Sequence, residues 1–161
     1  MTRTPHALRL SAARTLRLGG GLIWVAAAIH FVALPLLRRT VAGQLTPEAF
    51  AFVWPPLAFS FLLDGILLVP LGFTALYCAG GILRGERWAT VLGLTTASVV
   101  VLLPLVVGLV MGIRYFGATP FLVATLVILA AGILMFAPLV RLAHQGRQAV
   151  PASEARRRIH G

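Results

Sequence analysis

The stretch that decides the fold is Phe59–Gly72, which reads FSFLLDGILLVPLG. Apart from Ser60, its one strongly polar residue is a carboxylate, Asp64, and no other long apolar run in the chain contains an acidic residue. The stretch belongs to a longer run over residues 57–79, and a membrane-spanning helix needs about 20 apolar residues. A helix is expected because lipid leaves every backbone polar group to be satisfied within its own segment. Asp64 then requires a partner, a ligand or a proton.

The composition extends this interpretation to the whole chain. Of its 161 residues 59% are hydrophobic and 11% are charged, and the mean hydropathy is +0.94. Soluble domains are about 45–50% apolar and about 25% charged. We therefore predict an all-α integral membrane protein, folded as an antiparallel bundle of four transmembrane helices. The domain covers residues 18–140, with spans at about 18–37, 57–79, 88–112 and 120–140.

Polar segments flank and interrupt the predicted spans. Residues 1–17 are basic and are expected to form a short helix at the membrane interface, which Gly19–Gly21 would separate from the first span by a bend. Residues 141–161 form a basic tail that we expect to be disordered. Thr46-Pro47-Glu48 has the pattern of a helix start, and Pro55-Pro56 are expected to end the short helix begun there.

The arginines predict the orientation. The chain has 14 of them and no lysine. Eleven lie in the N-terminal segment, the 80–87 turn and the tail, and three lie on the other side, at Arg38, Arg39 and Arg114. An excess of basic residues marks the cytoplasmic side, so both termini are predicted to be cytoplasmic, in the inner (cytoplasmic) membrane. Arg38, Arg39 and Arg114 are expected at the outer interface. There they would bind lipid headgroups or form the mouth of a site for an anionic or amphipathic ligand.

The net charge of +10 indicates a lipid partner. Because the charges flank apolar runs, we expect contact with the bilayer and with anionic lipid headgroups, and no binding of nucleic acid.

Two faces are expected on the second span. Small residues recur at helical spacing there, and a GxxxG pattern lies in the third span; such residues let helices approach closely. The predicted packing residues are Ala58, Gly65, Gly72, Ala79, Gly108 and Gly112. About a quarter-turn away, Ser60 and Thr74 share a polar face with Asp64.

His30 is the one histidine inside a predicted span, and it is expected at the same membrane depth as Asp64. At 1.5 Å per residue, both lie about 5 Å to the outer side of the bilayer centre. Three hypotheses follow for this intramembrane pair. It is a proton relay or ligand site, an interhelical hydrogen bond of about 0.6–2 kcal/mol, or a place where Asp64 meets a donor on a partner protein.

No catalytic pattern is present, and neither catalytic residues, metal ligands nor cofactors are predicted. A bilayer haem usually needs two facing histidines, and a lone Cys78 excludes an intramolecular disulfide. The leading hypothesis is an accessory or scaffold subunit of a larger inner-membrane assembly, with other membrane subunits or a second copy as partners. The alternatives are a small ligand or proton-coupled carrier using His30 and Asp64, and a membrane enzyme acting on a lipid or quinone.

Overall fold

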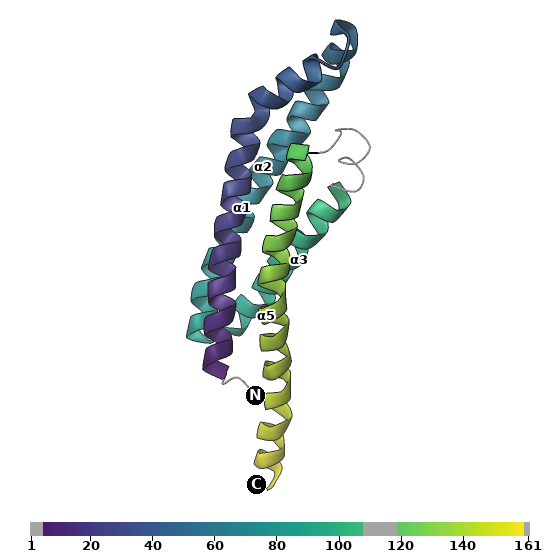
Figure 1. The fold of residues 1–161 in the computed structure, drawn as a ribbon. Coiled ribbons are helices and arrows are strands. Elements are labelled where there is room, and N and C mark those ends of the chain that lie inside the picture. The colour runs from purple at the N-terminus through teal and green to yellow at the C-terminus, as the bar shows by residue number, and fades with distance from the viewer. Residues whose placement is uncertain (1–4, 108–118, 160–161) are drawn as a thin grey trace.

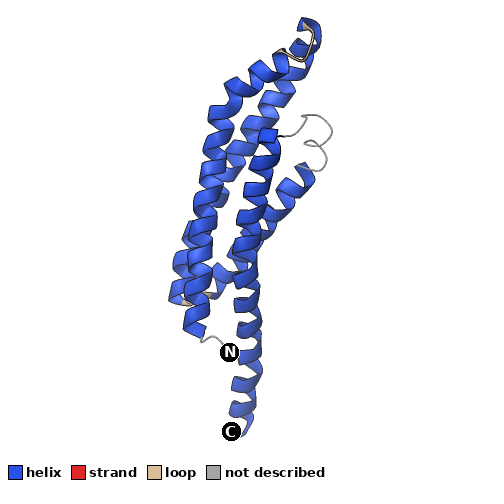
Figure 2. Cartoon of the chain, in the orientation of Figure 1, coloured by secondary structure: helices blue, strands red, loops and turns tan. Residues whose placement is uncertain are grey.

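Long helices make up nearly all of the described chain (Figure 2). The computed structural model describes residues 5–107 and 119–159, and the side chains of residues 6–106 and 125–145. Its helices are α1 (Pro5–Ala42), α2 (Pro47–Arg84), α3 (Arg87–Val107) and α5 (Thr119–Ile159). The described residues contain no strand, and each helix has a segment long and apolar enough to cross a membrane. The all-helical class and the number of candidate spans are thereby confirmed for this part of the chain.

The helices form an up-and-down bundle. α1 packs against α2 and α5, and α3 also packs against α2 and α5, so that each helix has two main neighbours. Figure 1 shows successive helices running in opposite directions, with both ends of the described chain at the same end of the bundle. α3 leans away from the other helices towards its own C-terminal end.

Small side chains fill the centre of the bundle. Alanine supplies eight of the seventeen residues in the buried apolar cluster. The largest fully buried side chains include Leu16, Ile23, Leu68, Met135 and Leu139. A core rich in alanine lets the helix backbones lie close together, which is the main source of helix association in lipid.

Glycines set the separation of α1 and α2 at two levels. A methyl group added to Gly65 would stand 2.9 Å from Cβ of His30. Closer to the end of the bundle where the termini lie (Figure 1), Gly20 and Gly72 face each other. A methyl group on Gly20 would lie 3.1 Å from the carbonyl oxygen of Gly72, and a methyl group on Gly72 would lie 3.2 Å from the carbonyl oxygen of Gly20. The hairpin of α1 and α2 therefore depends on missing side chains at both levels.

The first helix is longer than predicted. α1 continues through Gly19–Gly21 without the expected bend, because Gly19 packs against Met135 and Gly20 packs against α2. Leu8, Ala12 and Leu16 belong to the segment 1–17 that we expected at the membrane interface, but they are buried inside the bundle.

The second and last helices also extend further than expected. α2 starts as predicted, with Thr46 as its cap: the Ala49 N–H donates to Thr46 Oγ1 at 3.4 Å. It then continues through Pro55-Pro56, which we expected to end it; neighbouring helices and local adjustments make proline tolerable in apolar helices. The tail, expected to be disordered, is helical to Ile159, in keeping with its many alanines and arginines.

A two-residue turn joins α2 to α3. Gly85 ends α2 in the left-handed conformation, with φ of 80°, and its N–H donates to the carbonyl of Ile82 at 3.0 Å. Arg84 Nε donates to Glu86 Oε1 at 2.6 Å. This hydrogen bond holds the pKa of Glu86 below its usual value.

The glycine contact at Gly65 can be tested by substitution. Gly65→Ala should lower the free energy of unfolding by about 1–3 kcal/mol, because Cβ of His30 is fixed to its backbone and cannot rotate away. Gly21→Ala is the matched control: nothing lies within 4 Å of a methyl group there, so it should gain about 0.5–1 kcal/mol of helix stability. Thermal unfolding in detergent measures both, and an equally stable Gly65→Ala variant would contradict this packing.

Candidate functional site

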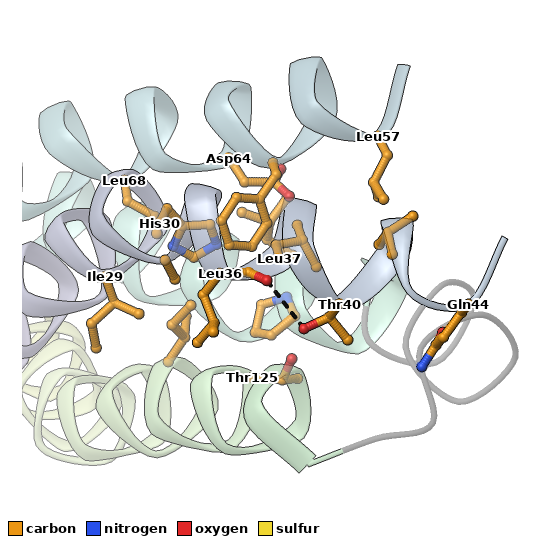
Figure 3. Close-up of a pocket in the computed structure, with 16 residues that line it drawn as sticks. Ile29, His30, Leu36, Leu37, Thr40, Gln44, Leu57, Asp64, Leu68 and Thr125 are labelled. Atoms are coloured by element: carbon orange, nitrogen blue, oxygen red, sulfur yellow. Dashed lines mark hydrogen bonds between the residues drawn. The ribbon is translucent and has the colours of Figure 1, made fainter. Parts of the chain in front are cut away.

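A cavity of about 250 Å³ lies between the helices, and all four described helices contribute to its wall. α1 supplies His30, α2 supplies Phe61 and Asp64, α3 supplies Pro104 and α5 supplies Thr125. Figure 3 shows His30 and Asp64 on neighbouring helices at the edge of this space, with Thr125 across from them. The rest of the wall is mostly leucine and isoleucine, so the cavity is apolar with a few polar groups.

The lining of the first two helices follows helical spacing. On α1 it includes His30, Ala33, Leu37 and Thr40, with Gln44 following in the turn after the helix, and on α2 it includes Leu57, Phe61, Asp64 and Leu68. Intervals of three and four residues mark one face of a helix. Extending the faces of His30 and Asp64 in this way would have found Thr40, Gln44 and Phe61, which sequence analysis missed. No comparable signal marks Thr125 or Pro104.

His30 is held by its own helix and by an aromatic ring. The residue is 6% exposed, and its Nδ1 lies 2.7 Å from the carbonyl oxygen of Ala26. Because a carbonyl only accepts, Nδ1 carries the proton and donates it. The imidazole also lies against Phe61, with ring centroids 4.6 Å apart and an angle of 35° between the planes. These contacts fix the ring and leave Nε2 without a hydrogen bond among the described residues.

Asp64 is half-buried and has no hydrogen bond or ion pair within the described part of the chain. His30 is close enough to interact with its charge, but the hydrogen bond proposed between them is not formed. Among described residues that are not exposed, Gln145 Oε1 is the one side-chain polar atom that is inaccessible to solvent and lacks a hydrogen-bond partner. The Asp64 oxygens and Nε2 of His30 are therefore accessible, and the cavity is the space that they line.

The other polar residues predicted on α2 lie away from the cavity. Ser60 is half-buried, and the Thr74 hydroxyl donates to the carbonyl of Pro70 at 2.8 Å. Neither lines the cavity. Thr74 thus satisfies its own helix, a common role for threonine in apolar helices.

The predicted packing residues occupy one side of α2. Gly65 and Gly72 contact α1, Ala79 is buried in the core, and Ala58 is half-buried in the N-terminal half of the helix. Gly108 and Gly112 lie outside the described residues.

The predicted outer-interface arginines do not enter the cavity. Arg38 and Arg39 are exposed on α1 and do not belong to its wall. Arg114 lies outside the described residues.

In the part of the chain that the structure describes, no three His, Cys, Asp or Glu residues are grouped so that they could hold a metal ion. The chain matches no known family model, and no curated protein or solved structure is detectably similar to it. Function must therefore be argued from the cavity and its polar groups.

The lack of a partner for Asp64 among the residues that the structure describes predicts the outcome of removing its charge. Asp64→Asn should leave the thermal stability of the ligand-free protein unchanged or higher, because no hydrogen bond or ion pair is broken and a carboxylate no longer has to be desolvated. Thermal unfolding in detergent, compared with Glu48→Gln at an exposed position of α2, measures this. A large loss of stability specific to Asp64→Asn would instead show that the carboxylate is part of the packing.

Proposed function

We propose that the protein is a multi-pass membrane protein that binds a small, mostly apolar ligand in the cavity between its helices, as a ligand-binding protein or carrier. The observation that supports this most directly is Asp64, an acid that has no partner among the described residues and lines an apolar cavity. Ionisable residues at membrane depth are costly and usually mark ligand or ion sites. An apolar pocket with a few convergent polar groups is the usual form of a small-molecule site.

The cavity's volume bounds the ligand. Drug-sized molecules occupy sites of about 300–1,000 Å³, and an apolar cavity of about 150 Å³ accepts benzene. At about 250 Å³, the space suits one ring or a short chain with a polar end.

We prefer this function to that of a scaffold subunit. The association hypothesis relied on the small-residue face of α2, but Gly65 and Gly72 are already packed against α1 of the same chain. That part of the face is not free for another subunit. An enzyme would need groups placed around a reacting atom, and the described wall offers His30 and Asp64 as its titratable groups.

Membrane placement is part of the proposal. α1 and α2 have 38 residues each, which is about 57 Å of helix, against a hydrocarbon core of about 30 Å. Their ends then extend into or past the headgroups. The arginine distribution supports cytoplasmic termini in the inner membrane, with the basic ends of the chain against anionic lipid.

Filling the cavity tests ligand binding. Ala33 lines the cavity and Ala28 is exposed on the same helix, so Ala33→Leu and Ala28→Leu form a matched pair. A ligand at 100 times its dissociation constant stabilises a protein by about 2.7 kcal/mol. In thermal unfolding with 2-phenylethylamine or 2-phenylethanol as probe, wild type and Ala28→Leu should be stabilised, and Ala33→Leu should not. Equal shifts in all three proteins would place binding elsewhere and refute this function.

The orientation can be tested separately. A C-terminal fluorescent protein that matures only in the cytoplasm should be bright in membranes, and a C-terminal alkaline phosphatase that requires the periplasm should be inactive. A cysteine introduced at Gln44, at the opposite end of the bundle, should react with a membrane-impermeant maleimide in intact cells, with Cys78→Ala as background. The opposite pattern of both reporters would reverse the assignment.

A further inference from the structure

We propose that the cavity selects an organic ammonium ion, namely a primary or secondary amine with an apolar body of about one ring. The inference rests on the proposed ligand-binding function and specifies its ligand. It follows from the charge of the cavity, from the hydrogen-bonding character of its polar groups and from its size.

The charge of the described wall is one-sided. Asp64 is its acid, and no arginine or lysine belongs to the wall. Arg38 and Arg39, which lie on α1 close in sequence to the lining residues, are exposed and do not belong to the wall. A buried carboxylate is stabilised most by a positive charge that reaches it with hydrogen bonds. A cationic ligand supplies the charge that the described wall does not, and an anion meets repulsion.

Three of the five polar side chains that line the cavity present acceptors towards it, namely those of His30, Thr40 and Asp64. Nδ1 of His30 donates to Ala26, so a neutral imidazole presents Nε2 as an acceptor. The Thr40 hydroxyl donates its proton to the carbonyl of Leu36 at 3.1 Å, which leaves oxygen lone pairs (Figure 3). Asp64 as a carboxylate accepts only. A ligand that satisfies these groups must donate several hydrogen bonds, and an ammonium group has up to three N–H bonds to give.

The remaining wall suits the rest of such a molecule. Phe61 lines the cavity beside both His30 and Asp64, and the face of an aromatic ring attracts a cation within about 6 Å. Of the seven leucine and isoleucine side chains in the wall, Leu103 and Ile128 come from α3 and α5, the two helices that do not carry His30 or Asp64. An amine with one apolar ring therefore places its charge against α1 and α2 and its body against Leu103 and Ile128.

Three probes that share a phenylethyl body test the choice of charge. 2-Phenylethylamine is a cation at pH 7, 2-phenylethanol is neutral and 3-phenylpropanoate is an anion. Binding to the purified full chain in detergent is measured by calorimetry. Wild type should bind the amine at least about tenfold more tightly than the alcohol, and should not bind the anion detectably.

Two variants assign the preference to Asp64. Asp64→Asn should weaken amine binding by about thirtyfold or more and leave binding of the alcohol within about threefold. Glu48→Gln, which neutralises an exposed acid of the same helix, should change neither. If Asp64→Asn does not fold, the order of the three probes in wild type decides the question.

The outcomes separate this inference from the function on which it rests. If the alcohol binds as tightly as the amine, or if a folded Asp64→Asn keeps full amine affinity, the cationic ligand is refuted while a ligand-binding cavity stands. If none of the probes binds wild type, or if Ala33→Leu binds them all unchanged, the cavity is not a binding site and both proposals fail.

Discussion

The spacing of α1 and α2 at the level of His30 depends on the absence of a side chain at Gly65. Because a methyl group there would meet Cβ of His30 at 2.9 Å, the histidine and the acid one residue before Gly65 lie on helices held in near backbone contact. Gly20 and Gly72 repeat this constraint further along the hairpin. The hairpin thus forms a wall that carries four of the cavity's five polar side chains, and α3 and α5 close the opposite side.

Most polar side chains in the bundle are satisfied without help from another helix. Thr74, Thr95 and Thr96 each donate to a carbonyl four residues earlier, and Nδ1 of His30 does the same. Asp64 cannot follow this pattern, because a carboxylate has no proton to donate to a carbonyl. Unlike the threonines and His30, Asp64 therefore cannot satisfy its polar atoms within its own helix. Proteins retain such unsatisfied polar residues in apolar segments chiefly at functional sites.

The sequence predicted where apolar helices form better than where they end. Hydropathy identified all four candidate spans. The prediction that Gly19–Gly21 and Pro55-Pro56 interrupt the helices was wrong, because close packing and lipid-compatible adjustments outweigh local propensity. Residue counting predicted a common depth for His30 and Asp64, and the structure places both on the wall of one cavity. Their common cavity was not predictable, since its other half comes from Pro104 and Thr125, whose positions depend on how α3 and α5 are rotated in the bundle.

The order of the elements has a consequence for how this protein is made. A ribosome delivers α1 and α2 before the rest of the chain, and the Gly20–Gly72 and Gly65–His30 contacts lie wholly within that first half. The two helices of the nascent hairpin can therefore pack against each other while the second half of the chain is still being translated. His30 and Asp64 then lie on one surface that has already formed, and α3 and α5 need only pack against it.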